Sequence, residues 1–131
     1  MIGEAIAFKV AAMEGRLAKI NEGTDTPTIE VYGGTRPATG AAASDGALCV
    51  ISLTRPAGSV NATTGALTLT QLEDGLNLAT GIATWCRVKS GAGGFCFDMD
   101  AGVTGSGVEA IFATTQLYAG GGLRLVSCVL G

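Results

Sequence analysis

The stretch from residue 81 to residue 100 constrains the fold most, because two alternating runs of residues flank a glycine-rich break there. Alternation of apolar and polar residues is typical of a half-buried strand, and a short glycine-rich link between two such runs is typical of an antiparallel hairpin. The pattern predicts strands over about 82–89 and 94–100, joined by residues 90–93. The chain therefore contains a β-sheet with one covered face.

The register of this hairpin assigns its side chains to two faces. With residues 90–93 as the loop, directly opposed residues share a face, as do Val88 and Phe95. The predicted core face contains Ile82, Cys86, Val88, Phe95, Phe97 and Met99. On the predicted outer face, Trp85 lies opposite Asp98 and Arg87 lies opposite Cys96. Cys86 and Cys96 then face opposite sides, so they cannot form a disulfide with each other.

One helix is predicted at the N-terminus, over about 3–22. Its apolar residues recur at intervals of three and four and form a single stripe: Ile6, Val10, Met13, Leu17 and Ile20. Gly23 supplies a C-terminal stop. The stripe either covers the protein's own sheet or forms a seam with other subunits.

The rest of the chain reads as short strands between turn signals. Further strands are predicted over about 28–32, 48–53, 66–70, 108–114 and 123–130, and residues 71–80 read as irregular or as one helical turn. Residues 35–46 form a long loop that either carries contacts or wraps a neighbour. About seven short strands and one N-terminal amphipathic helix predict a mainly β fold, an antiparallel β-sandwich or jelly-roll-like domain that spans residues 1–131.

Composition excludes several classes of partner. The net charge is −3 and the eight basic residues are scattered, so no nucleic-acid partner is expected. No apolar run approaches the roughly 18 residues of a membrane helix, and the N-terminus does not read as a secretory signal, so no membrane partner is expected. Charged residues make up only 15% of the chain, which suggests that partners bury part of its surface.

Catalytic and metal-binding patterns are missing from the sequence. The chain has no histidine, which removes the usual base of a serine or cysteine nucleophile. Asp98 and Asp100 alternate on one predicted strand without the other ligands of a calcium loop, so solvation or an ion pair with Arg87 is the favoured interpretation. We therefore expect no enzyme activity, no catalytic residues, no cofactor and no metal.

The four cysteines, Cys49, Cys86, Cys96 and Cys128, contain no close pair of the kind that binds zinc. They are either small buried apolar residues or partners in disulfides within or between subunits. Cys96, on the predicted outer face, is the candidate for an intermolecular bond. Its neighbours Trp85 and Arg87 are candidate interface residues, since both types are enriched at interface hot spots. The alternative for Trp85 is a surface position covered by the helix or the long loop.

Several motifs in the same order resemble a family of small tailed-bacteriophage and prophage virion proteins. They are TPTIEVYGGTRPA (26–38), ATGIATWCRV (79–88), the pair FD (97–98) and GVTGSG (102–107), preceded by the amphipathic helix. Members of that family commonly carry an aromatic residue at the position of Cys86 and a glycine at the position of Met99. The resemblance spans nearly the whole chain and implies a non-enzymatic part of the particle.

The function implied by this resemblance is that of a capsid decoration or linking protein. Such a protein would be made in the bacterial cytoplasm and located on the capsid surface of the virion. Its partners would be the major capsid protein, other capsid proteins and other copies of itself in an oligomer. The cysteines would then allow disulfide reinforcement once the particle meets an oxidising medium. The alternatives are a neck, collar or tail-fibre component, or, in another class, a carbohydrate-binding β-sandwich that assists host attachment.

Overall fold

The apolar stripe at the N-terminus folds into helix α1 (Ile6–Ile20) in the computed structural model, which describes residue 3 and residues 5–131. The stripe packs on the protein's own barrel through Met13, Leu17 and Ile20, whereas Ile6 stays exposed. The helix is shorter than predicted and ends before the predicted stop, with Asn21 as its C-cap. The predicted start includes Glu4, which lies outside the described residues.

The remaining described residues form a strand at each of the seven predicted places and four further short strands. The strands are β1 (Thr28–Tyr32), β2 (Cys49–Val60), β3 (Leu67–Gln71), β4 (Gly75–Leu76), β5 (Gly81–Ile82), β6 (Trp85–Lys89), β7 (Phe95–Gly102), β8 (Ala110–Phe112), β9 (Gln116–Leu117), β10 (Gly122–Leu123) and β11 (Leu125–Leu130). Seven of them close into one barrel in the order β1-β2-β3-β11-β8-β7-β6. The short strands form two separate pairs, β10 with β4 and β5 with β9.

The predicted sandwich is wrong, although the prediction of a mainly β fold with one helix is confirmed. A sandwich and a barrel share the same alternation of inward and outward residues, so the pattern alone does not separate them. The curvature comes from β2, which pairs with β1 through its first residues and with β3 through its last. The β2–β3 pairing shifts register between Leu53 and Gly58, and Gly58 packs against the backbone of Thr68, where a side chain would clash. The strand therefore continues through Pro56 to Val60, beyond the end predicted at about residue 53.

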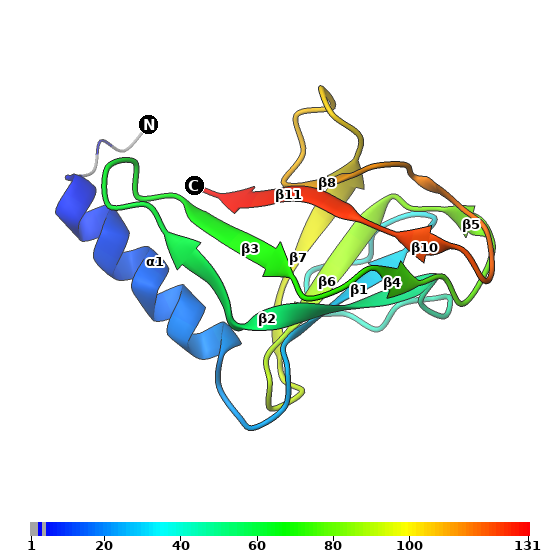
Figure 1. Ribbon diagram of the computed structural model, residues 1–131, viewed down its shortest axis with the longest axis horizontal. Helices are drawn as coiled ribbons and strands as arrows, with labels where there is room; N and C mark the ends of the chain where they lie inside the picture. The colour runs from blue at the N-terminus through cyan, green and yellow to red at the C-terminus, as the bar shows by residue number, and fades with distance from the viewer. Residues whose placement is uncertain (1–2, 4) are drawn as a thin grey trace.

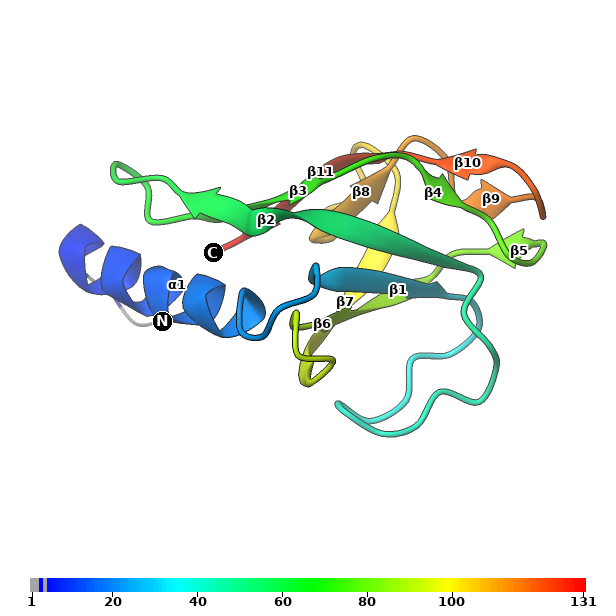
Figure 2. The same cartoon turned by 60° about the horizontal axis from the view of Figure 1, so that its bottom comes forward.

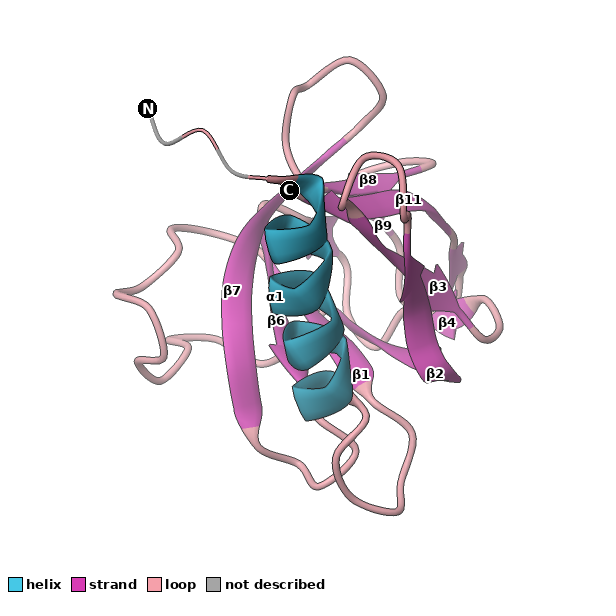
Figure 3. Cartoon of the chain, turned by 90° about the vertical axis from the view of Figure 1, so that its left-hand side faces the viewer, coloured by secondary structure: helices cyan, strands magenta, loops and turns pink. Residues whose placement is uncertain are grey.

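The two ends of the barrel are built differently (Figure 1). At one end α1 lies across the barrel between β7 and β2, as the view in Figure 3 shows. At the other end lie β4, β5, β9 and β10, far from the helix, as Figure 2 shows. The barrel closes through a short parallel contact in which only Ala101 and Gly102 of β7 pair with β8. Among the residues that the structure describes, the first part of β7 therefore has a neighbouring strand on one side only.

The β6–β7 hairpin forms, but its pairing differs from the predicted register. Trp85 lies opposite Asp100, and Arg87 lies opposite Asp98, a shift of two residues that leaves most faces unchanged. A bulge at Cys96 then breaks the alternation, because Val88 pairs with Phe97 whereas Lys89 pairs with Phe95.

Three predicted positions are reversed in the structure, two of them by this bulge. Phe95 was predicted in the core but is exposed and lies against Arg87 on the outer face. Cys96 was predicted on the outer face but packs at the edge of the core with Phe97. Ile82 was also predicted in the core, yet it lies on β5, outside the barrel sheet, and is exposed.

Candidate functional site

The predicted interface residues Trp85 and Arg87 lie together on the outer face of β6. The Trp85 ring stacks on Tyr32 of β1, with ring centroids 4.4 Å apart and an interplanar angle of 14°. The Arg87 guanidinium lies 5.3 Å from the Trp85 ring centroid and 5.2 Å from that of Phe95. These distances allow cation–π attraction between the guanidinium and each of the two rings. The three strands thus present one aromatic and cationic cluster.

Asp98 of β7 completes this cluster by accepting two hydrogen bonds from Arg87. Nε donates to Oδ1 at 2.8 Å and Nη2 donates to Oδ2 at 3.1 Å. The Asp98 side chain has no exposed surface, so this is a buried ion pair. Burial raises the pKa of Asp98, but the hydrogen bonds from Arg87 and from the Gly40 amide outweigh it and hold the pKa below its usual value. Of the two alternatives for the acidic pair, the ion pair with Arg87 is the one that Asp98 forms, whereas Asp100 pairs with Arg36 and stays exposed.

The long loop of residues 33–46 covers the cluster and is called the strap below. The strap's backbone accepts hydrogen bonds from Trp85 Nε1 at Gly33 (3.3 Å) and from Arg87 Nη2 at Ala41 (2.6 Å). Its Gly40 amide donates to Asp98 Oδ2 at 3.1 Å. Trp85 and Arg87 consequently expose only 2% and 8% of their surface. The structure therefore agrees with the alternative in which the long loop covers Trp85. This loop wraps the protein's own barrel.

All four cysteines are free thiols, so no disulfide forms within the chain. Cys49, Cys86 and Cys128 are fully buried inside the barrel, and burial raises the pKa of each thiol, that of Cys128 to about 12. Cys128 Sγ lies 3.6 Å from the Met99 sulfur. Only Cys96 is partly exposed, and burial raises its pKa as well. An intermolecular bond at Cys96 stays a prediction.

Among the described residues, no three acidic or cysteine side chains are grouped so that they could hold a metal ion. Asp98 forms an ion pair with Arg87, and Asp100 lies 3.3 Å from Arg36 of the strap. The hydrogen bonds that Trp85, Arg87 and Asp98 form with the strap make this cluster a structural lock between β6, β7 and the loop.

Within the described part of the chain, no helix has the length and apolar character needed to cross a membrane.

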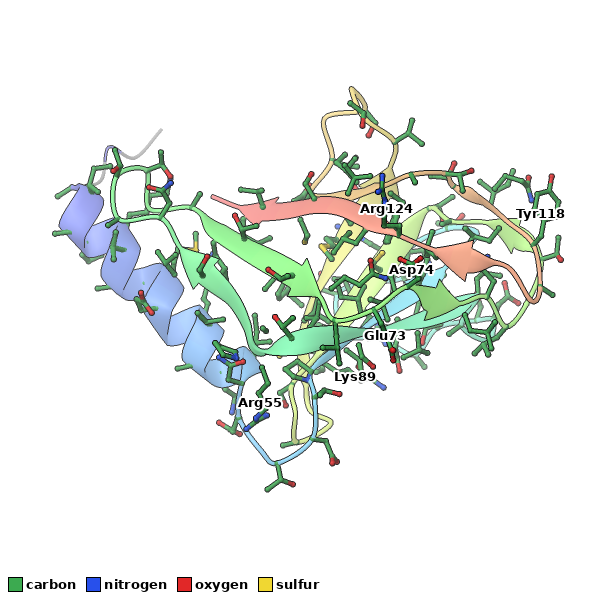
Figure 4. All side chains as sticks on the ribbon, viewed as in Figure 1. Arg55, Glu73, Asp74, Lys89, Tyr118 and Arg124 are labelled. Atoms are coloured by element: carbon green, nitrogen blue, oxygen red, sulfur yellow. The ribbon has the colours of Figure 1, made fainter. Side chains whose placement is uncertain are left out.

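A different surface is open to a partner, namely the barrel end opposite α1. Four large apolar side chains there each expose 57–65% of their surface: Leu76, Leu78, Ile82 and Tyr118. They are called the apolar end below. Figure 4 shows Tyr118 at this extremity, whereas the labelled charges Arg55 and Lys89 lie far from it. Apolar side chains exposed together in this way are typical of interaction sites.

Asn77 fixes the backbone of the apolar end. Its side chain is 4% exposed and its Nδ2 donates to the carbonyl of Tyr118 at 3.2 Å. Its backbone N–H donates to Gly121 at 2.8 Å, and the Gly120 amide donates back to Asn77 at 2.9 Å. These bonds hold the segment of β4 and β5 against the segment that follows β9. Leu76, Leu78 and Tyr118 are therefore carried on backbone segments that these hydrogen bonds hold together.

Sequence reasoning missed the apolar end because it treated residues 71–80 as irregular. The signal was present in Leu76-Asn77-Leu78, where two apolar residues flank a polar one between Gly75 and Gly81. In a strand this alternation places both leucines on the same face. Since Asn77 points inward, both leucines point outward.

Comparison of the chain with protein-family models, with curated proteins and with solved structures found no match.

Proposed function

We propose that this chain is a non-enzymatic structural protein of a tailed-bacteriophage particle, which binds the assembled coat shell from outside and stabilises it. The resemblance of its four motifs to small virion proteins supports this assignment. The observation that carries the mode of action is the apolar end, where Leu76, Leu78, Ile82 and Tyr118 are exposed on a backbone fixed by Asn77. These side chains dock on the coat, and α1 faces away from it.

The free energy expected from burying the apolar end is that of a weak contact, which many copies on a lattice would have to repeat. Covering each of the four half-exposed side chains contributes roughly 1–2 kcal/mol. Association costs about 4–15 kcal/mol, so one apolar end holds a single copy weakly. Neighbouring copies that contact each other on the lattice convert this weak contact into strong retention. The decoration role therefore requires many copies per particle.

A carbohydrate-binding role is less well supported by the same geometry. Sugar sites need exposed aromatic faces beside polar groups, but Trp85 and Tyr32 stack on each other and are buried. Tyr118 is the one exposed tyrosine, and its neighbours at the apolar end are leucine and isoleucine.

Purified particles that carry the protein provide the test. We expect Leu78→Glu to reduce the number of copies retained per particle at least tenfold, because it places a charge in the middle of the apolar contact. Val126→Glu, at an exposed valine of β11, is the matched control and should bind as the unmodified chain does. Particles stripped of the protein should rupture at lower temperature and milder osmotic shock. Equal survival with and without the protein, or its absence from particles, would overturn the proposal.

A further inference from the structure

A second surface lies at the opposite end of the molecule, where the barrel is least complete. It is a groove of about 570 Å³ between α1, the start of β7 and the end of β11. Its apolar wall is formed by Phe95, Phe97 and Leu130, and its rim on the helix side carries Arg16 and Lys19. A volume of this size is typical of ligand-binding clefts. The proposed docking through the apolar end leaves this groove open to a second partner.

The backbone along the groove has an unused strand edge. From Phe95 to Asp100, β7 pairs with β6 on one side, and β8 joins its other side only at Ala101 and Gly102. On the facing side, β11 pairs with β8 only as far as Cys128, so the residues of β11 after Cys128 do not pair with β8. An open edge of this kind presents N–H and C=O groups that another extended chain can pair with.

The positive charge on the rim of the groove favours an occupant with an acidic side chain. Lys19 is engaged by Glu22, with Nζ 3.0 Å from the carboxylate. Arg16 donates only to the sulfur of Met13, at 3.7 Å, and among the described residues no carboxylate pairs with it. An occupant with an acidic side chain would therefore find a free guanidinium, with which a carboxylate forms a strong two-point contact.

We propose that the groove binds an extended segment of another protein, which adds to the free edge of β7, packs apolar side chains on Phe97 and Leu130, and places a carboxylate beside Arg16. A fatty acid would satisfy the apolar wall and Arg16 but not the strand edge. The peptide is favoured because it satisfies all three features. This binding site does not depend on the proposed role in the capsid.

The first test is selection from a display library of random octapeptides on the immobilised protein. We expect the recovered peptides to alternate apolar residues with polar ones and to contain at least one acidic residue. Arg16→Glu should weaken the best of them at least tenfold by fluorescence anisotropy. Arg124→Glu, on the other side of the barrel (Figure 4), makes the same change in net charge and should leave affinity within twofold. Equal loss in both variants, or no recovered peptide, would overturn the proposal.

Two further measurements separate strand addition from other modes of binding. Cys96 lines the groove, so saturating peptide should slow its alkylation at least fivefold. The same peptide with N-methyl groups on alternate amides keeps its side chains but loses donors to the strand edge, and it should bind at least tenfold more weakly. Equal binding of the methylated peptide would refute strand addition. Protection of Cys96 by decanoate but not by peptides would assign the groove to an amphiphile and overturn the proposal.

Discussion

Replacing Asp98 by asparagine tests the lock between the strap and the barrel most directly. Asp98 accepts two hydrogen bonds from Arg87 and one from the Gly40 amide, and its side chain has no exposed surface. Asparagine keeps the shape of the side chain and one acceptor oxygen, but it removes the charge. The variant therefore leaves the Arg87 guanidinium buried without a counter-charge.

The structure gives both the size of the effect and a control for it. A hydrogen bond to a charged group contributes about 1.5–3 kcal/mol, and removing one member of a buried ion pair costs about 3–5 kcal/mol. Because asparagine retains part of the contact, we expect Asp98→Asn to lower the free energy of unfolding by about 2–3 kcal/mol. Asp100→Asn removes the same charge from the same strand. Its pair with Arg36 is exposed, so we expect a change of less than about 1 kcal/mol.

The pH dependence has a definite sign. The pKa of Asp98 is below its usual value of 3.8 in the folded state, although burial alone would raise it. Folding therefore favours the ionised carboxylate, and this contribution to stability is complete above pH 3.8 and is lost as the pH falls below that value. The difference between the unmodified protein and Asp98→Asn should be constant near neutral pH and shrink below about pH 4.

Urea unfolding followed by the fluorescence of Trp85, the single tryptophan, provides the assay. With a dependence of about 1–3 kcal/mol per molar urea, the expected loss moves the midpoint down by roughly 1 M. The slope should stay unchanged if both variants unfold in one step. Equal midpoints for Asp98→Asn and Asp100→Asn would show that the buried pair does not hold the strap, and the reasoning would be refuted.

Three further predictions concern other parts of the barrel. At pH 8, Cys96 should be the first thiol of the folded protein to react with a disulfide reagent, although more slowly than a free thiol because burial raises its pKa. All four thiols should react in denaturant, and Cys96→Ser should abolish the first phase; equally fast reaction of a second thiol would contradict the buried positions of the other three. In thermal unfolding, Gly58→Ala should lower stability by about 1–3 kcal/mol, because the added methyl group meets the backbone of β3. The control Gly46→Ala places its methyl group in open space and should change stability by less than about 0.5 kcal/mol. Similar values for both variants would contradict the close approach of Gly58 to β3. Burial and the hydrogen bond to Glu30 raise the pKa of Tyr32 to about 12. In a Tyr118→Phe variant, which leaves Tyr32 as the one tyrosine, the absorbance should titrate near pH 12 and the stability should fall between pH 10 and 12. A midpoint near pH 10 would contradict the burial of Tyr32.

Local patterns in the sequence predicted the elements well where one face of each element is covered. The apolar stripe of α1 was placed on the protein's own barrel by Met13, Leu17 and Ile20, which resolves one of the alternatives left open. The seven predicted strands are present, with Trp85 and Arg87 on the outer face of β6 as predicted. Each of these features depends on a repeat of two residues or of three to four residues, which side-chain burial imposes directly.

The errors arose where a single residue changed the repeat or where distant segments met. The bulge at Cys96 reversed Phe95 and Cys96, and no local pattern marks where an extra residue will be accommodated. The apolar end required Asn77 to turn inward toward Tyr118, a contact between segments 41 residues apart. The candidate site therefore moved from the hairpin to a surface that the sequence had left unassigned.

Composition and alternation are properties of neighbouring residues, so they were enough to predict a mainly β chain with one amphipathic helix. The closure of the strands into a barrel and the position of the strap over Trp85 and Arg87 follow from contacts in the folded molecule. Closure depends on the register shift of β2 and on the short parallel contact between β7 and β8. Those pairings join residues far apart in the chain, so their geometry is set by the packing of the whole molecule rather than by any local run of residues.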